Sequence, residues 1–373
     1  PMKIMTVLGT RPQIIKAGPV SAALAQAGIT EVLVHTGQHY DSNMSDVFFD
    51  ELGLKPPQYM LSVGSGTLGY QVGEGLQRIE AILKAEAPDM LLVYGDTSAT
   101  MAGALAAAYH HIPLAHVEAG LRSFNRRMPE EINRVTTDHL AQWCFVPTQT
   151  AVENLAKEGI CHGQADRYVY RVGDVMLDAA THYLQRAQAK HPDFYATNGL
   201  TEQPYVLLTM HRAETTAAPE KVLRLLQQLD TTAQKQGWTV LFPVHPRTQP
   251  LIEAIAPTLK TIRCVPPLSY LEMLLAEAGA YWIVTDSGGV QKEAAFFQVP
   301  CLTLRTETEW VETITSGWNQ IVGFDPETLG NRLLQRQVPE ETIHHLYGHG
   351  QAAQAIAKAL LNHYTPARAV PAT

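Results

Sequence analysis

The sequence lacks the marks of several large classes of protein. Its 373 residues hold 28 Lys and Arg against 36 Asp and Glu, a net charge of −8, without any basic block. This balance predicts no binding to nucleic acid. No apolar run approaches the roughly 18 residues that cross a bilayer, so we predict no membrane insertion. The cysteines are scattered without a CxxC pair, which argues against a zinc ribbon or a secreted disulfide scaffold and favours the reducing cytoplasm.

The length of the chain exceeds that of one compact domain, so two domains are expected. Apolar runs that end in glycine or polar turns alternate with amphipathic stretches, which is typical of βαβ units around a parallel sheet. The pattern restarts near residue 175, and this predicts an α/β protein with a domain boundary there. The expected strands are Lys3–Leu8, Glu31–His35, Met90–Tyr94, Leu114–Val117 and Trp143–Pro147 in the first half, then Tyr205–Met210, Thr239–Pro243, Tyr281–Thr285 and Cys301–Leu304. A final helix is expected over Gly350–Tyr364.

The residues just after the strands matter most, because ligands of open α/β sheets bind beyond the carboxyl ends of the strands. The first strand runs into Gly9–Pro12, and Lys16 follows about one turn into the next helix. Arg11 and Lys16 are therefore placed to hold an anion, such as a diphosphate leaving group, at the start of this helix. The alternative is a tight turn with two solvated basic side chains.

Carboxylates follow two later strands of the first half. Asp96 comes after Met90–Tyr94, and Glu118 directly follows Leu114–Val117. A third acid, Glu130, lies one helical turn before Arg134. Carboxylates that cluster raise one another's pKa, so that one of them can exchange a proton near neutral pH. The structural alternatives are a helix N-cap for Asp96 and a plain helix salt bridge between Glu130 and Arg134.

The second half of the chain carries a matching set of polar residues at its strand ends. His211 and His245 follow two strands, and Asp286 leads into Ser287-Gly288-Gly289 at the start of a helix. Free backbone N–H groups at such a start favour a phosphate, and the small residues let a diphosphate approach closely. Glu293, about one turn further on, could accept hydrogen bonds from ribose hydroxyls. An N-cap accounts for Ser287 alone, not for the two glycines and the acid.

Two other patterns are interpreted as structural. The segment Gly64–Gly69 matches GxGxxG, but it follows a poor strand and two βα units, so we do not expect a dinucleotide site there. Neither His116 with Glu118 nor the cluster His344, His345 and His349 has the spacing of a known metal-ligand set. We expect ordinary hydrogen-bonded or surface histidines.

Over nearly its whole length the chain resembles the non-hydrolysing UDP-N-acetylglucosamine 2-epimerases. The segments that carry the resemblance, in order, are Gly9–Pro12, Gly95–Thr97, His116–Arg122, Pro129–Arg134, Val244–Pro246, Thr285–Glu293 and Tyr347–Ala352. The resemblance implies an α/β fold of GT-B type, in which two Rossmann-like domains face each other across a cleft and a C-terminal helix returns to the first domain. The corresponding division is 1–174 for a domain with the catalytic carboxylates, 175–350 for a UDP-binding domain, and 351–373 for the returning helix.

The family interconverts the gluco and manno forms of a UDP-HexNAc by anti elimination of UDP and re-addition to a 2-acetamidoglucal, here for surface polysaccharide precursors. The resemblance implies an isomerase without a metal or redox cofactor, usually a homodimer. By the same resemblance, the catalytic residues are Asp96, Glu118, Glu130 and His211, and the substrate-binding residues are Arg11, Lys16, Arg134, Ser287, Gly288, Gly289 and Glu293. Which carboxylate acts on which face of the sugar stays open at this point.

The sequence departs from the commonest family pattern at several places. Many members have Glu where this chain has Gln13, and Arg where it has Trp310. With the segment Ser123–Met128, these variants resemble the branch that epimerises UDP-2,3-diacetamido-2,3-dideoxyglucuronate, whose extra carboxylate we expect Arg126 or Arg127 to meet. The family's allosteric Gln-His-Arg-Gln stretch reads Gln38-His39-Tyr40-Asp41 here, which leaves activation by substrate open.

Three other functions fit parts of the pattern. A GT-B glycosyltransferase would share the UDP site, but the carboxylates of the first domain favour epimerisation. A hydrolysing epimerase would release free sugar after elimination, and the sequence does not separate it from the non-hydrolysing enzyme. A catalytically silent UDP-sugar-binding protein is disfavoured, because every proposed ionisable role is filled.

Overall fold

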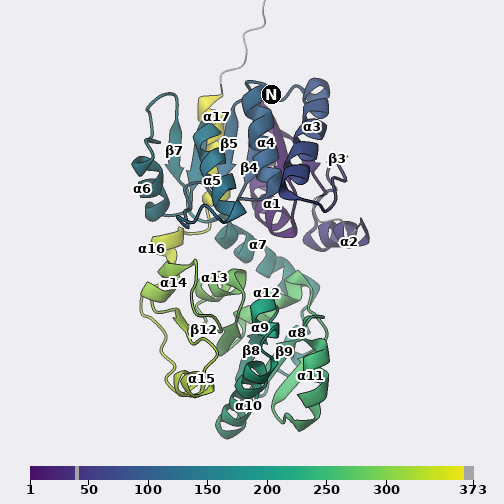
Figure 1. Ribbon diagram of the computed structural model, residues 1–373, viewed down its shortest axis with the longest axis vertical. Helices are drawn as coiled ribbons and strands as arrows, with labels where there is room; N and C mark the ends of the chain where they lie inside the picture. Colours follow the sequence, from purple (N-terminus) through teal and green to yellow (C-terminus); the bar gives the residue numbers. More distant parts are fainter. Residues whose placement is uncertain (38–41, 365–373) are drawn as a thin grey trace, which may run out of the picture. The chain divides into compact units, whose positions relative to one another are not determined.

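The computed structural model describes residues 1–37 and 42–364, and the Gln38–Asp41 stretch lies outside them. By internal contacts the chain forms two compact units, Pro1–Ala179 with the chain from Leu346 onward, and Ala180–His345. Each unit is built on one parallel sheet covered by helices (Figure 1). The predicted α/β class is therefore confirmed. No helix of the described residues is long and apolar enough to cross a membrane.

The first unit, here called unit 1, holds a sheet of seven strands in the order β3-β2-β1-β4-β5-β6-β7. Chain order reverses between β1 and β4, which makes this pair the topological switch point where a ligand is expected. The strands are β1 Lys3–Leu8, β2 Thr30–His35, β3 Tyr59–Met60, β4 Met90–Tyr94, β5 Leu114–Val117, β6 Trp143–Val146 and β7 Tyr168–Arg171. The helices are α1 Arg11–Gln26, α2 Ser42–Leu52, α3 Leu68–Glu86, α4 Ser98–Tyr109, α5 Pro129–Leu140, α6 Gln149–Lys157 and α17 Ala352–His363, with α7 Val175–Lys190 continuing into the other unit.

The second unit, unit 2, repeats the plan with six strands in the order β10-β9-β8-β11-β12-β13, and its switch point lies between β8 and β11. The strands are β8 Tyr205–Thr209, β9 Thr239–Pro243, β10 Ile262–Val265, β11 Trp282–Thr285, β12 Cys301–Thr303 and β13 Asn319–Ile321. The helices are α8 Phe194–Thr197, α9 Ala213–Thr216, α10 Pro219–Gln236, α11 Gln249–Ile255 with a 3-10 turn at Ala256–Thr258, α12 Tyr270–Ala278, α13 Gly288–Phe296, α14 Val311–Thr315, α15 Pro326–Leu333 and α16 His344–Tyr347.

The central strands are apolar because they are covered on both faces. Every residue of β4, β5, β8 and β9 is buried. Helix α4 packs closely on the sheet through small residues, since a Cβ at Gly103 would lie 2.8 Å from Val93 Cγ1. This close packing fixes the start of α4, and with it the turn that carries Asp96.

The sequence pattern missed the edges of both sheets. The strands β3, β7, β10 and β13 were not predicted, and all four are sheet edges with partly exposed residues. In β10, only Ile262 is buried. A half-exposed edge strand lacks the continuous apolar run that marks a buried parallel strand, which explains the omission.

The C-terminal helix α17 packs against α1 in unit 1, as expected of a helix that returns to the first domain. Figure 1 shows α17 in yellow among the blue elements of that unit. The Asp178 carboxylate accepts hydrogen bonds from the backbone N–H groups of Ala352 (3.2 Å) and Ala353 (2.9 Å). These bonds satisfy two free donors at the start of α17 and fix where it begins.

Candidate active site

The first polar contact at the switch point of unit 1 joins Lys16 of α1 to Glu118 at the end of β5. The Lys16 ammonium forms an ion pair with Glu118 Oε1, and the two side chains are 16% and 9% exposed. Burial lowers the pKa of Lys16, but the charges of Glu118, Asp96 and Asp174 outweigh it and raise that pKa above its ordinary value. Lys16 is thus a fixed cation, and both predicted carboxylates lie close enough to act on it.

Glu118 itself has a strained backbone. Its φ of 68° lies in the left-handed region, which a residue with a side chain seldom adopts. Two residues later, Gly120 has φ 82°, and a Cβ there would lie 2.6 Å from the carbonyl oxygen of Ala151. Strain of this kind persists where the surrounding structure holds it, and it concentrates at functional sites. The turn after β5 is therefore shaped to present the Glu118 carboxylate.

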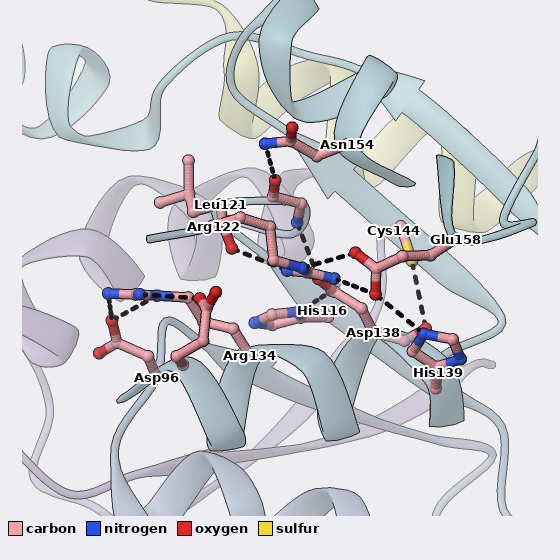
Figure 2. A network of polar contacts seen from close by, with 12 residues as sticks. Asp96, His116, Leu121, Arg122, Arg134, Asp138, His139, Cys144, Asn154 and Glu158 are labelled. Carbon is pink, nitrogen blue, oxygen red and sulfur yellow. Dashed lines mark hydrogen bonds and ion pairs between the residues drawn. The ribbon is translucent and has the colours of Figure 1, made fainter. Parts of the chain in front are cut away.

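Asp96 is held by the guanidinium of Arg134 from α5 (Figure 2). Its Oδ2 accepts hydrogen bonds from Arg134 Nε (3.0 Å) and Nη2 (2.7 Å), and its backbone carbonyl accepts one from Asn133 Nδ2 (2.9 Å). The N-cap alternative for Asp96 is wrong, because Thr97 caps α4 in a capping box with Thr100. The Asp96 carboxylate therefore does not cap the helix, and it pairs with the charged side chain of Arg134.

Glu130 and Glu131 have separate places on α5. Glu130 is exposed, whereas Glu131 is 1% exposed and accepts hydrogen bonds from the backbone N–H groups of Ser123 (3.0 Å) and Phe124 (2.6 Å). Arg134 bonds to Glu131 (3.4 Å) as well as to Asp96, and the structural alternative, a helix salt bridge between Arg134 and Glu130, is not formed among the described residues. Glu130 lies on the same helix face as Arg134, and its carboxylate is exposed. The sequence did not predict that Glu131 holds the loop that begins at Ser123.

Arg11 lies apart from the ion pair of Lys16. Its guanidinium carbon is 4.1 Å from the ring centroid of Phe48, a cation–π contact, and the residue is exposed. Both basic residues of this helix were expected to hold an anion, and that role stays a prediction. The structure gives them different neighbours, Phe48 for Arg11 and Glu118 for Lys16.

Gln13 ties the turns after β1 and β4 together. Its carboxamide oxygen accepts a hydrogen bond from Gly9 N (2.8 Å), and its nitrogen donates to the Tyr94 carbonyl (2.7 Å) and to Thr97 Oγ1 (2.9 Å). The side chain is buried, and its amide offers the donor and the acceptor that these contacts need, which an ionised carboxylate of the same length does not. A carboxylate at this position would face the Tyr94 carbonyl without a donor.

In unit 2 the predicted His211 meets Asp286, which follows β11. The Asp286 carboxylate is fully buried and accepts hydrogen bonds from His211 N (3.2 Å), Arg212 N (3.1 Å) and Thr215 Oγ1 (2.7 Å). His211 Nδ1 lies 3.3 Å from Asp286 Oδ1, and the imidazole is 46% exposed. Asp286 therefore fixes the His211 turn and leaves the ring open to solvent. The sequence marked Asp286 only as the residue before Ser287.

The start of α13 has the geometry expected of a diphosphate site. Ser287 is its N-cap and accepts a hydrogen bond from Val290 N (3.4 Å), so the structural alternative for Ser287 is also present. A Cβ at Gly288 would lie 2.3 Å from Glu309 Oε1 and 3.3 Å from Trp310 Nε1. Only glycine therefore fits this position without displacing a neighbour. The remaining free N–H groups of the helix start can bind an anion.

Glu293 lies further along α13 and is buried with Glu277 of α12; their exposed fractions are 6% and 0%. Burial and the charge of Glu293 raise the pKa of Glu277 well above its ordinary value. Burial raises the pKa of Glu293 to about 7, against the lowering effects of Glu277 and Lys292. The pair therefore holds a proton at neutral pH. The sequence indicated Glu293 but not Glu277, which is distant in the chain.

The predicted residues thus form two groups. Unit 1 brings Lys16, Asp96, Glu118 and Arg134 together, and unit 2 brings His211 to the turn that precedes Ser287–Gly289. Each group lies at the strand ends of a switch point, β1/β4 and β8/β11. The Gly64–Gly69 segment instead follows β3 at an edge of the sheet, away from the position of a dinucleotide fingerprint.

The fold and these two groups define a nucleotide-sugar enzyme of GT-B type. The structure of MurG from Acinetobacter baumannii shares the fold, with a TM-score of 0.60 over 97% of this chain and 100% of that chain at 14% sequence identity. A family model described as UDP-N-acetylglucosamine 2-epimerase matches residues 22–361. The chain therefore belongs to the UDP-N-acetylglucosamine 2-epimerase family, and the predicted enzyme class, an isomerase, is confirmed.

Individual relatives agree with this assignment. The chain is 44% identical to a UDP-N-acetylglucosamine 2-epimerase homolog of Methanococcus maripaludis, over 97% of this chain and 100% of that protein. It is also 44% identical to the UDP-2,3-diacetamido-2,3-dideoxy-D-glucuronate 2-epimerase of Pseudomonas aeruginosa, over 96% and 99%. The crystal structure of Methanocaldococcus jannaschii UDP-GlcNAc 2-epimerase in complex with UDP-GlcNAc and UDP is 40% identical, with a TM-score of 0.80 over 97% and 100%.

Proposed function

We propose that this chain is a non-hydrolysing 2-epimerase of a UDP-N-acetylhexosamine-type sugar, either UDP-GlcNAc or its 2,3-diacetamido-glucuronate analogue. The observation that carries the proposal is the pair of ion-paired carboxylates in unit 1, Glu118 with Lys16 and Asp96 with Arg134. They stand at the switch point, where a ligand of such a sheet binds. Epimerisation at carbon 2 needs proton acceptors and donors, and carboxylates supply both.

The chemistry explains why carboxylates and cations occur together. The hydrogen on carbon 2 is not next to a carbonyl, so direct deprotonation would form an unstabilised carbanion. UDP therefore leaves first with the electron pair of the C1–O bond, and the oxocarbenium character that develops acidifies the hydrogen on carbon 2. A carboxylate takes that proton, and a C1–C2 double bond forms. UDP then adds back to carbon 1 while a proton reaches the other face of carbon 2.

The residue roles follow from the two groups. Asp96, Glu118 and Glu130 supply the proton acceptors and donors, supported by Arg134, while Lys16 and Arg11 hold the departing diphosphate. In unit 2, His211 is the fourth catalytic residue. The start of α13 at Ser287–Gly289 binds the diphosphate, and Glu293 accepts the ribose hydroxyls. This assigns chemistry to the domain 1–174 and nucleotide binding to the domain 175–350, with 351–373 returning to the first domain.

Proton NMR in heavy water tests the proposal. The purified protein is incubated separately with UDP-GlcNAc and with UDP-2,3-diacetamido-2,3-dideoxyglucuronate. Deuterium that enters carbon 2 together with a manno product supports elimination and re-addition and names the sugar. Release of free sugar would instead identify a hydrolysing epimerase. Absence of exchange with both sugars, with UDP still bound, would favour a glycosyltransferase or a silent binding protein.

A matched pair of variants tests the catalytic assignment of Glu130. Glu130 and Glu220 are both exposed and both follow the proline that begins a helix, Pro129 in α5 and Pro219 in α10. Glu130→Gln should lower the exchange rate by about 10²-fold or more, the usual contribution of a general acid or base. Glu220→Gln should leave the rate unchanged. Equal rates in both variants would remove Glu130 from the mechanism.

The loop Ser123–Met128 is proposed to bind the carboxylate of the diacetamido-glucuronate. Glu131 holds its first backbone N–H groups, and its two arginines, Arg126 and Arg127, are exposed. Arg126→Ala or Arg127→Ala should therefore lower activity on the diacetamido-glucuronate more than on UDP-GlcNAc. Equal losses on the acidic and the neutral sugar would contradict this reading.

We further infer a cytoplasmic homodimer. All four cysteines are free, and two of them, Cys144 and Cys301, are buried, as suits a reducing compartment. Sedimentation velocity should give twice the mass of the chain, and fractionation of the producing cells should place the protein with soluble cytosolic markers. A monomeric mass would refute the dimer.

A further inference from the structure

His116 lies inside β5, two residues before Glu118, and both of its ring nitrogens face oxygen atoms. Figure 2 shows His116 beside Asp138. Nδ1 is 2.6 Å from Asp138 Oδ1, and Nε2 is 2.8 Å from the carbonyl oxygen of Gly95. His116 and Asp138 are each 0% exposed. The contacts therefore belong to the interior of unit 1, under the two turns that carry Asp96 and Glu118.

These contacts determine how the imidazole is protonated. The Gly95 carbonyl can only accept a hydrogen bond, so Nε2 carries a proton. The second oxygen of Asp138 accepts hydrogen bonds from Gly120 N (2.9 Å) and Arg122 Nη1 (2.8 Å), which favour the ionised carboxylate. An ionised carboxylate only accepts, so Nδ1 carries a proton as well. His116 is thus an imidazolium.

The electrostatics agree with that geometry. Burial lowers the pKa of His116, but Asp138, the Gly95 carbonyl and Glu118 together raise it above its ordinary value. Burial in turn raises the pKa of Asp138, and the cations His116 and Arg122 hold it below its ordinary value. Arg122, whose side chain is 1% exposed, also bonds to Glu158 (2.8 Å). Two cations are thus balanced by two carboxylates, as buried charges require.

The pair joins two turns that are distant in sequence. On one side His116 binds the carbonyl of Gly95, the residue before Asp96. On the other side Asp138 binds the backbone N–H of Gly120, two residues after the strained Glu118. A neutral imidazole has one N–H donor, so it could not bond to both oxygens. With Asp138 ionised, only the imidazolium can bond to both oxygens, and its charge strengthens the hydrogen bonds that attach the two turns to one buried centre.

We propose that His116 is a positioning residue for the epimerisation: as a buried imidazolium paired with Asp138, it holds the Asp96 and Glu118 turns in the arrangement that the reaction needs. The inference rests on the proposed function, because it gives these two carboxylates their role. The alternative is that the pair only stabilises the fold, and a measurement of stability alone would not separate the two.

The protonation state is measured first, on the unaltered protein without substrate. Nitrogen NMR of a sample labelled in its histidines reports whether each ring nitrogen carries a proton, and His116→Gln assigns the signal. Both nitrogens of His116 should stay protonated at pH values above the ordinary histidine pKa of about 6.5. A neutral tautomer there would overturn the proposal. This result does not depend on which reaction the protein catalyses.

Asp138→Asn then tests the positioning role with little change of shape. The amide can keep one oxygen toward Gly120 and Arg122 while its nitrogen donates to His116 Nδ1, which becomes neutral. We expect kcat for the exchange at carbon 2 to fall about tenfold or more, with KM and UDP affinity little changed. Neutral hydrogen bonds hold the two turns less firmly than charge-assisted ones, and carboxylate placement acts in the transition state. His116→Gln should show the same split between kcat and KM.

His110→Gln is the matched control. His110 also bonds to a carboxylate, Glu80 (2.6 Å), but it lies at the surface after α4. This variant should keep kcat, KM and stability. Lower stability of Asp138→Asn with an unchanged kcat would show a purely structural pair and overturn the proposal. If the unaltered protein shows no exchange with any sugar, the proposed function fails instead, and the positioning role fails with it while the imidazolium is still decided by NMR.

Discussion

The acidic side chains at the two switch points of this protein have different partners. In unit 1 each predicted carboxylate faces a cation, Glu118 the ammonium of Lys16 and Asp96 the guanidinium of Arg134. In unit 2 the buried carboxylate of Asp286 is held mainly by backbone N–H groups and a hydroxyl, and Glu293 is buried beside a second acid. The same fold therefore supports one turn built on ion pairs and one built on neutral donors.

This difference in partners corresponds to two proposed functions, proton transfer at the ion pairs and nucleotide binding at the neutral donors. Ion pairs inside a protein keep their charges in place, so unit 1 offers charged groups that can move a proton or stabilise a cation. Free backbone N–H groups carry no charge to be neutralised, so the start of α13 can accept a diphosphate without first breaking a salt bridge. Variants of the unit 1 carboxylates should thus lower kcat, and variants at the start of α13 should weaken nucleotide binding.

The largest effect is expected from Glu118→Gln. The amide keeps the shape of the side chain but can neither take a proton nor balance Lys16, so kcat should fall by about 10²- to 10⁴-fold. UDP affinity, measured by calorimetry, should stay near that of the unaltered protein. Glu80→Gln, at a partly exposed glutamate bonded to His110, is the control. A parallel loss of UDP affinity would remove the distinction between the two switch points.

Gly288→Ala should weaken UDP binding by about tenfold, or about 1.4 kcal/mol. The added methyl group would lie 2.3 Å from Glu309 Oε1 and 3.3 Å from Trp310 Nε1, so the Glu309 side chain must move. The methyl group itself then stands at the start of α13, where the small residues are proposed to let the diphosphate approach. Gly73→Ala, in α3 with open space around it, is the control and should not change the affinity. Unchanged binding in Gly288→Ala would place the diphosphate elsewhere.

The affinity for the nucleotide sugar should fall as the pH drops below about 7, where burial places the pKa of Glu293. Only the ionised carboxylate accepts both ribose hydroxyls, so the loss approaches tenfold per pH unit at most. Calorimetry with UDP-GlcNAc and the inactive Glu118→Gln variant avoids turnover during the measurement. The pH dependence should disappear in Glu293→Gln; its persistence there would assign it to another group.

The same acids should make the protein less stable in alkali. A carboxyl group whose pKa is raised by folding holds its proton more tightly in the folded state, so its contribution to stability is lost as pH rises from the ordinary value of about 4.5 to about 7. Glu277→Gln removes one titrating acid and keeps a hydrogen-bond donor. Its melting temperature should therefore exceed that of the unaltered protein above neutral pH and converge with it in acid. An equal difference at all pH values would contradict the assignment.

The smallest effect is expected from Gln13→Glu, which restores the residue that many family members carry. The carboxylate would lose the hydrogen bond to the Tyr94 carbonyl, at a cost of about 1–3 kcal/mol in the free energy of unfolding. Gln77→Glu, at an exposed position in α3, should change that free energy little. Denaturant unfolding of both variants measures the difference. Equal stability would show that the turn tolerates either residue.

The sequence by itself predicted the central strands and the groups at their ends. Lys3–Leu8 and Met90–Tyr94 were predicted with the bounds that the structure has, because a strand covered on both faces must be continuously apolar. Asp96 and Glu118 could be named because chemistry in such sheets follows the strand ends. The half-exposed edge strands β3, β7, β10 and β13 carry no comparable signal, and they were missed.

The tertiary structure decided which charge meets which partner. Lys16 pairs with Glu118 rather than joining Arg11, and Arg134 bonds to Asp96 and Glu131 instead of Glu130. His116 was expected to be an ordinary histidine, and only its contacts with Asp138 and Gly95 give it a charge. Spacing along the chain places side chains on a face or at a strand end. The protonation and pairing of buried groups depend on neighbours brought from distant elements, which no local pattern records.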